Sequence, residues 1–550
     1  MSDPVSRVRQ SGLLSSSVVM AAGTVASRFT GFLRAAVIAA AIGLLGKTAD
    51  TFNLPNTIPN MIYILVAGGV LNAVLVPVMV RAIKEDADGG QAYSQRLFSV
   101  VVTILALATV VAVAAAPWLL RVFVDAEYLL PENREYFADM VMFARFCLPQ
   151  IFFYGLYVLV GQMMNARGRF GPMMWAPVVN NIVAIAVFAA YLVVFGQKGA
   201  EPYDTTEIAL LGAGSTLGVA LQAVVLVPVL RRAGFRLRFR TDWRHAGLGQ
   251  AGRLGFWTLA FVVLNQVAYL VVIRTASGGS AAGEAGVTVY MNAILIMMVP
   301  HAIITVSLAT ALLPKLADHA SDGKLALVRD RLESAIRVCL AVMVPVAALL
   351  AALAVPLAAL IFDYGAASGE TRSLAYTLIA LLPGLVAFTV HYLVLRGFYA
   401  LQDTRTPFLV QISIAATMVV NALVVGFGAT AEWTTVLLAG GYSLAYVIGA
   451  SVSLTVLGRR IGGIPQLPLL GHIALLAVPA AAGGLAGYAL VRLLDGPLAG
   501  LPGLVANAVT LAVAGTAGVL IFGGLAYPMR IVEVHQAVDA IRQRIKTQRA

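Results

Sequence analysis

Arginines inside apolar stretches are the residues whose chemistry most needs an explanation: Arg28, Arg34, Arg145 and Arg274. A charge at the centre of a bilayer costs about 2.5–3.5 kcal/mol on insertion scales, so each should face a wet cavity or a partner. The planar guanidinium group matches phosphate oxygens with paired hydrogen bonds. We therefore predict a cavity that receives an anionic group.

Arg28 and Arg34 are the more informative pair, because both belong to the first apolar stretch. Counted at about 1.5 Å per residue from Leu14, Arg28 lies roughly 21 Å along a helix, which is deep for a side chain to reach the surface. The pair is separated by about 120° on an ideal helix, so a shared face requires a kink or unwinding, for which Gly31 is available. The alternative is structural: the arginines pair with Asp50 or bind neighbouring carbonyl groups.

Arg145 and Arg274 are further candidate binding residues. Arg274 stands near the outer end of its stretch, where a long side chain can extend to the interface. Arg145 stands near the middle of its stretch, before Pro149. It is equally suited to helix packing or to a cavity.

A polar, proline-broken segment opens the second apolar stretch. Asp50 is followed by asparagines and prolines as far as Asn60. Such backbone at membrane depth is tolerated where it lines a water-filled cavity, so Asp50 and Asn60 are candidate binding residues. The alternative for Asp50 is an ordinary helix N-cap.

The composition excludes most other classes of protein. Hydrophobic residues make up 60% of the 550 residues and charged residues 12%, against roughly 25% charged in soluble domains, so a water-soluble enzyme is excluded. The net charge of +12 could indicate nucleic acid, but the basic residues lie in short loops. The two cysteines lie in apolar stretches, and His301 and His391 are interpreted as packing residues. We expect no metal and no cofactor.

Apolar blocks of about 20 residues, the length of a bilayer-spanning helix, recur along the chain and predict an all-α polytopic membrane protein. Lys and Arg are concentrated in every second connecting segment. Because cytoplasmic loops carry this excess, both termini are expected in the cytoplasm. Fourteen transmembrane helices are assigned, at 14–46, 51–80, 97–122, 139–164, 173–196, 207–230, 250–276, 286–314, 335–362, 373–398, 407–428, 433–457, 468–491 and 502–528.

Two short motifs recur at nearly one offset and predict a duplicated six-helix unit. Val70–Pro77 and Ser307–Pro314 stand 237 residues apart, and Asn165–Pro172 and Ala400–Pro407 stand 235 apart. Six helices return the chain to the same side, so we expect two parallel six-helix repeats, a transporter architecture, plus two extra C-terminal helices. The predicted division is an N-lobe at 1–232, a basic inter-lobe loop at 233–250, a C-lobe at 251–460, spans thirteen and fourteen within 461–528, and a basic amphipathic cytoplasmic tail at 529–550.

The loop between the lobes holds seven arginines from Arg231 to Arg253 against the single acid Asp242. One interpretation is that it only fixes topology. The other is that it lies along the anionic inner leaflet, where each basic residue contributes about 1 kcal/mol. Four apolar residues alternate with the arginines and are placed to anchor the loop at the headgroups: Phe235, Leu237, Phe239 and Trp243.

A series of motifs occurs in a fixed order along the chain: Ala26–Arg34, Thr48–Asn53, Ile58–Asn60, Ala144–Pro149, Asn165–Phe170, Ala176–Pro177, Ala311–Lys315, Ile361–Ala366 and Arg396–Pro407. In this order they resemble the MurJ/MviN lipid II flippases of the MOP exporter superfamily. The resemblance implies fourteen spans in two six-helix lobes plus a pair lining a lipid groove. It also matches Arg28 and Arg34 to the family's cavity arginines, and Asp50 and Asn60 to polar residues around its second span.

The sequence departs from the family pattern at three positions. Tyr63 stands where the family often has an arginine, and Leu295 and Met298 stand where an arginine and a glutamate are common. Arg145 or Arg274 is expected to substitute in the cluster that binds pyrophosphate.

The resemblance predicts a lipid II flippase, assisted by the membrane potential, which moves the undecaprenyl-pyrophosphate-linked peptidoglycan precursor across the bacterial cytoplasmic membrane by alternating access. We do not expect the protein to be an enzyme. Expected partners are lipid II, membrane lipids and proteins of cell-wall synthesis, without nucleic acid. The alternatives are a polysaccharide-repeat flippase or cation-coupled drug antiporter of the same superfamily, or a non-transporting scaffold of wall synthesis.

Overall fold

The computed structural model describes residues 4–65, 79, 82, 86, 88–169, 171–235, 238–242, 248–536, 539 and 543. In this part of the chain the regular secondary structure is helical throughout. Thirteen of these helical segments are long and apolar enough to cross a membrane, by length and composition. The predicted all-α polytopic class is thereby confirmed. The predicted span 51–80 and the motif Val70–Pro77 fall wholly or partly outside the described residues, so the count of fourteen stays a prediction.

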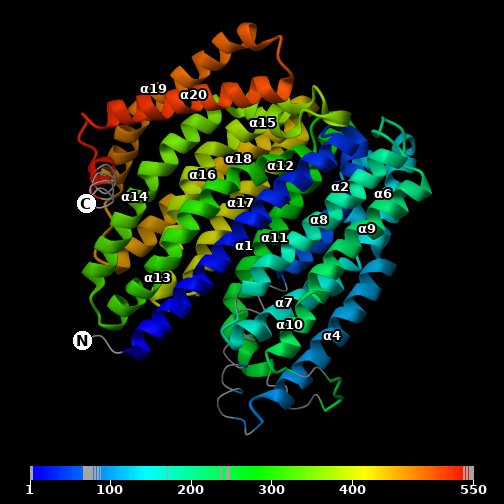
Figure 1. Ribbon diagram of the computed structural model, residues 1–550, viewed down its shortest axis with the longest axis horizontal. Coiled ribbons are helices and arrows are strands. Elements are labelled where there is room, and N and C mark those ends of the chain that lie inside the picture. Colours follow the sequence, from blue (N-terminus) through cyan, green and yellow to red (C-terminus); the bar gives the residue numbers. More distant parts are fainter. Residues whose placement is uncertain are drawn as a thin grey trace. The chain divides into compact units, whose positions relative to one another are not determined.

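The chain forms two compact units, of which unit 1 comprises Met1–Thr288 with Tyr364–Ser368. The short helix η6, Gly365–Ala367, packs against α1. Gly365 has φ +60° there, and a Cβ atom would come within 2.3 Å of the Ala40 carbonyl oxygen, so only glycine fits. The longer helices of unit 1, shown in Figure 1, are α1 (Pro4–Ile42), α2 (Gly46–Leu65), α4 (Gln91–Ala114), α5 (Ala116–Phe123), α6 (Arg134–Cys147), α7 (Gln150–Ala166), α8 (Gly171–Val194), α9 (Thr205–Val224), α10 (Leu226–Arg232) and α11 (Leu248–Ala281).

Several spans of unit 1 consist of two consecutive helices. Pro117 lies in the first turn of α5, just after the chain leaves α4, and Pro149 is the N-cap of α7, just after α6. Proline has no N–H to donate, so it is tolerated at the start of a helix, where that donor has no intrahelical partner. The prolines therefore mark where the second helix of each of these spans begins.

Unit 2 comprises Val289–Asp363 and Gly369–Ala550. Its central helix is α16, which packs against α13, α14, α15 and α18. Helices α19 and α20 approach so closely that a Cβ atom on Gly483 would lie 2.5 Å from the Gly518 carbonyl oxygen, as is typical of small-residue packing in membranes. The helices are α12 (Val287–Pro300), whose first two residues belong to unit 1, the π-helix η5 (His301–Thr305), α13 (Val306–Ser321), α14 (Leu325–Ala352), α15 (Ala354–Phe362), α16 (Thr371–Ala400), α17 (Arg405–Gly428), α18 (Thr434–Arg460), α19 (Gln466–Leu498) and α20 (Gly503–Ala526).

The seventh long helix, α11, belongs to unit 1, whereas the sequence division places it in the C-lobe. Gln266 on α11 donates a hydrogen bond to the Met61 carbonyl of α2 (2.8 Å), and Arg274 donates to the Arg121 carbonyl of α5 (3.1 Å). These contacts explain why α11 packs with unit 1. The six-helix duplication itself stays a prediction.

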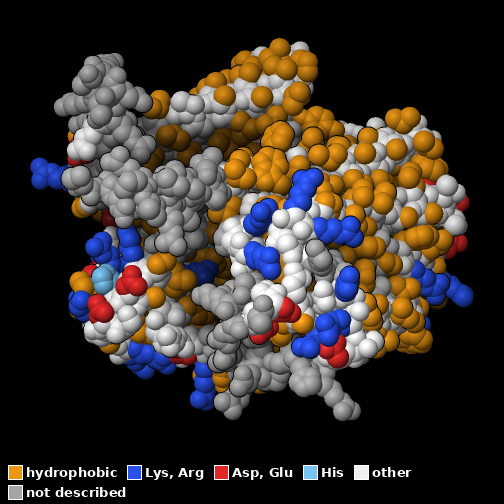
Figure 2. Space-filling model, turned by 60° about the horizontal axis from the view of Figure 1, so that its bottom comes forward, with side chains coloured by type: hydrophobic (Ala, Val, Ile, Leu, Met, Phe, Trp, Pro, Cys, Tyr) orange, Lys and Arg blue, Asp and Glu red, His pale blue; other side chains and the backbone are white. Residues whose placement is uncertain are grey.

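Exposed apolar side chains cover the flanks of the helices, and Lys and Arg side chains gather on the face turned forward in Figure 2. On α4, for example, Leu107, Val110 and Val111 are all more than half exposed. Such surfaces are expected of helices that face lipid.

Candidate functional site

Arg34 is oriented by an asparagine from another helix. Its Nη1 atom lies 3.4 Å from Oδ1 of Asn181 on α8. The Asn181 amide nitrogen in turn donates to the Ser27 carbonyl (3.1 Å) and the Thr30 hydroxyl (3.0 Å) of α1. The amide therefore presents its oxygen to the guanidinium group without neutralising the positive charge. Asn181 was not among the predicted site residues, although an asparagine pair inside an apolar stretch was a visible signal.

Arg28 is exposed on α1, and in the described residues it has no hydrogen-bond or ion-pair partner. Helix α1 runs without interruption from Pro4 to Ile42, so the unwinding considered at Gly31 is absent. Gly31 instead lies against the Asn181 amide, 3.7 Å from where a Cβ atom would stand. The two arginines are thus presented from one continuous helix in different directions.

Three tyrosines surround this part of unit 1. Tyr63 packs on Tyr154 with ring centroids 4.9 Å apart and lies 6.5 Å from the ring of Tyr157. Tyr154 is close enough to Arg34 to interact with it electrostatically. The residue that stands in place of a family arginine therefore joins an aromatic cluster next to the remaining guanidinium group.

Two of the three asparagines of α2 form hydrogen bonds to neighbouring side chains, and the third is exposed. Asn53 donates to the Thr288 hydroxyl (3.0 Å), and Asn56 accepts from Gln150 of α7 (2.9 Å). Asn60 is exposed at the surface of unit 1. Of these three, Asn60 is the one open to a ligand.

Asp50 is buried and caps the start of α12. Its carboxylate accepts hydrogen bonds from the backbone of Val287 (2.7 Å) and from the backbone and hydroxyl of Thr288 (2.8 and 2.6 Å). A carboxylate at a helix N-terminus is favoured by the otherwise unpaired N–H groups and the helix dipole. A Cβ atom on Gly286 would come 2.4 Å from an Asp50 oxygen, so this position requires glycine. Asp50 thus caps the start of α12. The alternative drawn from the sequence was that it caps the start of the helix to which it belongs.

The other two predicted arginines differ in their surroundings. Arg274 is half-buried and donates to the carbonyls of Arg121 and Val122 at the end of α5 (3.1 and 3.2 Å), so its guanidinium group already has acceptors. Arg145 on α6 is exposed, without an ion pair or hydrogen bond within the described chain. Arg145 therefore resembles Arg28 in having its charge available.

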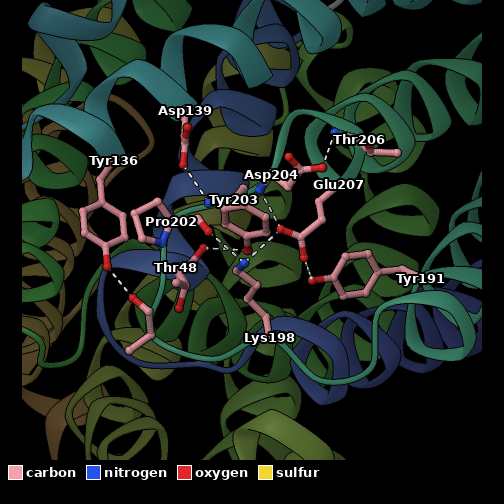
Figure 3. A network of polar contacts seen from close by, with 11 residues as sticks. Thr48, Tyr136, Asp139, Tyr191, Lys198, Pro202, Tyr203, Asp204, Thr206 and Glu207 are labelled. Atoms are coloured by element: carbon pink, nitrogen blue, oxygen red, sulfur yellow. Dashed lines mark hydrogen bonds and ion pairs between the residues drawn. The ribbon is translucent and has the colours of Figure 1, made fainter.

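A buried polar network around Lys198, Tyr203 and Glu207 joins α2 and α9 (Figure 3). Lys198 forms an ion pair with Glu207 of α9 (2.9 Å), and each side chain is only 9% exposed. Glu207 also accepts from the Tyr191 hydroxyl (2.6 Å). The Tyr203 hydroxyl donates to the Thr48 carbonyl of α2 (3.0 Å), and burial raises the pKa of Tyr203 well above its usual value, so this donor stays protonated.

The same network reaches α1 and α6. The Lys198 backbone donates to the Ala41 carbonyl (2.8 Å), and the Tyr203 backbone donates to Asp139 (2.8 Å). Asp204 caps α9, and its hydrogen bond from the Thr206 backbone lowers its pKa. Nothing local in the sequence predicts the partner of Lys198.

The inter-lobe loop is attached to α4 in the part that the structure describes. Asp242 accepts from Arg96 of α4 (2.7 Å) and from Arg240 (2.8 and 3.0 Å), and the Arg240 backbone donates to Ser99 (2.7 Å).

Phe235 is buried in unit 1, with the Arg167 guanidinium 4.2 Å from its ring centroid, so its predicted role as a headgroup anchor is wrong. Phe239 is 60% exposed and remains suited to that role. Leu237 and Trp243, and most of the predicted C-terminal tail, lie outside the described residues.

Unit 2 contains an apolar groove of about 560 Å³ between α14, α16, α18 and α19. Its few polar side chains include Gln466, which donates to Thr455 (2.7 Å). The groove is therefore suited to a hydrocarbon chain. Apolar lining residues include Leu340, Val344, Leu382, Val390, Leu454 and Leu469.

These features define a class: a multi-pass helical membrane protein whose apolar helices carry guanidinium groups without a carboxylate partner among the described residues. The fold is similar to a solved structure of the lipid II flippase MurJ in an inward closed conformation, with a TM-score of 0.71 and 16% identity over 93% of this chain and 99% of that chain. It is also similar to an inward-facing multidrug resistance MATE family transporter of the MOP superfamily, with a TM-score of 0.65 and 16% identity over 78% and 94% of the two chains. At these identities the likeness shows the fold alone.

The family model of the lipid II flippase MurJ matches residues 38–499. A probable lipid II flippase MurJ of Rhizobium meliloti (strain 1021) is 28% identical over 498 residues, which are 89% of this chain and 88% of the relative. A lipid II flippase MurJ of Burkholderia cenocepacia is 29% identical over 455 residues, 80% and 83% of the two chains. The chain belongs to the lipid II flippase MurJ family, and the resemblance inferred from the motifs is confirmed. It is a transporter, not an enzyme.

Proposed function

We propose that the protein moves lipid II, the undecaprenyl-pyrophosphate-linked peptidoglycan precursor, from the inner to the outer leaflet of the bacterial cytoplasmic membrane by alternating access, with both termini in the cytoplasm. Family membership supports the choice of substrate. The observation that carries the proposal is that Arg28 and Arg34 stand on one apolar helix without a carboxylate partner among the described residues.

The pyrophosphate group is the part of the substrate that these arginines recognise. A phosphate oxygen that binds Arg34 gains a charge-assisted hydrogen bond, which is roughly twice as strong as a neutral one. Asn181 leaves that charge intact because an amide carries none. Asp50 does not compete, because its carboxylate is buried against the start of α12.

Asn60 and Arg145 are proposed as further contacts, since both are exposed and Arg145 has no partner in the described chain. Arg274 is better explained as a ligand of the α5 carbonyls. We place the sugar and peptide portion in water, because it is polar.

The polyprenyl chain is proposed to use the apolar groove of unit 2. The groove lining offers almost exclusively aliphatic side chains, which can pack against the hydrocarbon chain by van der Waals contact in place of lipid tails. A bulky polar substitution such as Leu382→Gln is therefore expected to weaken transport of long-chain substrates more than of short-chain analogues.

Depletion of the protein in its own host tests the function. Lipid II should accumulate on the inner leaflet and return to normal with the wild-type gene. The Arg28→Ala/Arg34→Ala variant should fail to restore export, whereas Arg134→Gln, which removes an exposed arginine at the start of α6, should succeed. Full rescue by a well-inserted double variant contradicts the proposal.

The same experiment separates the alternatives. A cation-coupled drug antiporter, suggested by the MATE-like fold, predicts drug sensitivity without lipid II accumulation. A polysaccharide-repeat flippase predicts accumulation of a different lipid-linked sugar. A scaffold of wall synthesis predicts that the double arginine variant supports growth.

A further inference from the structure

After its last long helix the chain folds back onto unit 2. Helix α20 ends at Ala526, and Arg530 then adopts φ +55°, a left-handed conformation that is unfavourable for a residue with a Cβ atom. We call residues 531–536 the C-terminal segment: Ile531 is 2% exposed, and residues 532–536 are helical and lie beside α14 (Figure 1). The segment stands outside residues 38–499, which the family model matches, so family membership does not explain it.

Glu533 joins the C-terminal segment to a long helix. Its Oε1 atom lies 3.8 Å from Nε2 of His472 on α19, and the two side chains are 13% and 7% exposed. The Nε2 atom is buried without a hydrogen-bond partner. Hydrogen bonds of this kind have lengths of about 2.7–3.2 Å. The carboxylate and the imidazole are therefore within ion-pair distance of each other but are not yet hydrogen-bonded.

A cavity of about 340 Å³ lies between the C-terminal segment and α14. Its charged lining residues are Asp330, Glu333 and Arg337 of α14 and Glu533 of the segment. A polar cavity of this volume admits several water molecules, each of which occupies about 30 Å³ in the liquid. Glu533 therefore has access to water, and a proton can reach the imidazole beside it.

The other charged groups that α14 contributes to this cavity are already paired. Arg337 donates two hydrogen bonds to Oε1 of Glu333 (2.8 and 3.1 Å), and Asp330 forms an ion pair with Arg329 (2.9 Å). Glu533 has no lysine or arginine partner in the described part of unit 2. His472 is thus the base that stands next to an uncompensated carboxylate.

The other helices packed around His472 supply no competing charge within the described residues. Helix α20 has no ionisable side chain. At the end of α18, Arg460 pairs with Asp403, and Arg459 is exposed. The ionisable residues of α19 itself begin roughly 24 Å further along the helix, and they are Tyr488, Arg492 and Asp495.

The C-terminal segment contains a second histidine, His535, which is bound to its own part of the chain. Its Nδ1 atom lies 3.0 Å from the Ile531 carbonyl oxygen, and its ring stacks on Tyr527 with 4.4 Å between the centroids. Arg530, the cation that precedes the segment, is exposed. His535 is therefore the matched control for His472.

The charge of an imidazole decides how strongly it holds a carboxylate. Histidine is the side chain that ordinarily changes its charge between pH 5 and 8. A neutral ring offers Glu533 only a dipole, whereas an imidazolium adds an ion pair and a charge-assisted hydrogen bond. The docked segment then binds the proton more tightly than the released segment does. Docking is therefore strengthened as the pH falls and weakened as it rises.

We propose that the C-terminal segment is a pH-dependent latch, in which a proton taken from water by His472 closes the contact with Glu533 and holds the start of α19 against the segment and α14. Helices α14 and α19 form two walls of the apolar groove, through Ile336 and Leu340 and through Leu469 and Ile473. The latch therefore restrains the groove at the end where α19 begins. The proposal concerns unit 2 at rest and does not depend on the transported substrate.

Electron paramagnetic resonance on the full-length protein in phosphatidylcholine nanodiscs tests the latch. A spin label introduced by Val532→Cys reports docking, because Val532 is 60% exposed and belongs to the segment. The two native cysteines are buried, so protein without Val532→Cys should take up no label. From pH 8 to 5.5 the ratio of immobile to mobile label should rise by up to about tenfold per pH unit.

Variants assign the two roles. Glu533→Gln and His472→Gln should each leave the label more mobile at pH 5.5 and remove its pH dependence. His472→Lys, which keeps a positive charge at every pH tested, should hold the segment docked up to pH 8. His535→Phe, which keeps a ring on Tyr527, and His319→Gln on α13 should preserve the pH dependence of the parent protein.

Hydrogen exchange measures the effect on α19. At pH 6 the backbone amides of residues 466–473 should exchange several-fold faster in Glu533→Gln than in the parent, and at the parent rate in His319→Gln. The proposal is overturned if the label mobility of the parent is independent of pH, or if a folded Glu533→Gln protein keeps the pH dependence. Loss of the pH dependence in His535→Phe would also overturn it, because the sensor would then be the segment's own histidine.

Discussion

At the scale of residues, the site depends on how one asparagine holds one arginine. Asn181 uses both ends of its amide, binding α1 through its nitrogen and Arg34 through its oxygen. The arginines themselves were predictable, because charge in an apolar stretch is conspicuous. Asn181 was not, because its partners are about 150 residues away in the sequence and only packing of α1 on α8 brings them together.

Asn181→Asp should reduce transport more than Asn181→Ala. The new carboxylate would pair with Arg34 and compete with the pyrophosphate, and hydrogen bonds to charged groups contribute about 1.5–3 kcal/mol, which corresponds to a loss of roughly ten- to a hundredfold. Initial rates of lipid II transport in vesicles measure the effect. In an Arg34→Gln background the aspartate should cause little further loss; an undiminished effect there would disprove the coupling.

Asp50 is expected to matter for stability before it matters for binding. Asp50→Ala leaves the backbone N–H groups of Val287 and Thr288 buried without an acceptor, which costs about 1–3 kcal/mol. Gly286→Ala should act similarly, because its Cβ atom would collide with the carboxylate. Thermal unfolding in detergent should show a lower Tm for both variants. Wild-type stability of Asp50→Ala would contradict the capping role.

At the scale of elements, residues in the loops between helices make buried interactions that sequence patterns do not predict. The spans could be predicted from apolar length, because hydrocarbon forces the backbone into helices. The Lys198–Glu207 pair could not, since a basic residue in a short loop is read as a topology signal. Packing alone decides that it is buried and that it ties together the ends of α1, α2, α6 and α9.

Breaking the buried pair from one side should destabilise unit 1 strongly. Lys198→Met leaves Glu207 uncompensated, and removal of one partner of a buried ion pair typically costs about 3–5 kcal/mol. Lys198→Met/Glu207→Gln should recover much of that loss, because no net charge stays buried. The shift in Tm of the single and double variants measures this. If the double variant loses more Tm than the two single variants lose together, the ion pair does not stabilise unit 1.

The attachment of the inter-lobe loop has a defined pH dependence. Hydrogen bonds from Arg240 and then Arg96 hold the pKa of Asp242 far below its usual range. A depressed carboxyl pKa stabilises the folded contact at every pH above the unfolded value of about 3.9, and the contribution disappears as the pH falls through the folded value. The loop should therefore stay docked between pH 8 and 5.

Electron paramagnetic resonance of a spin label introduced by Arg238→Cys measures this docking. Label mobility should be constant from pH 8 to 5 and should rise in strong acid. Arg96→Gln should raise the mobility already at pH 7. A change in mobility near neutral pH in the parent protein would show that another group controls the loop.

At the scale of the whole molecule, composition and motif order were sufficient for the class and the family, which the family model and the relatives confirm. They do not show which helices α11 packs on, and the predicted lobe boundaries stay a prediction. Unit 1 extends along the chain to Thr288 because α11 packs on α2 and α5, and a hydropathy pattern carries no information on which neighbour a helix selects. The role of Asp50 at the start of α12 could not be predicted either, because it also depends on which helices pack together.

The central claim is that guanidinium groups on α1 recognise the pyrophosphate of a lipid that the protein transports. Its most direct test is the rate at which fluorescent lipid II becomes accessible on the opposite leaflet of liposomes containing the purified protein. The wild type and Arg134→Gln should transport it, while Arg28→Gln/Arg34→Gln should fall to the rate of protein-free liposomes. Equal transport by the wild type and a correctly inserted double arginine variant would contradict the account.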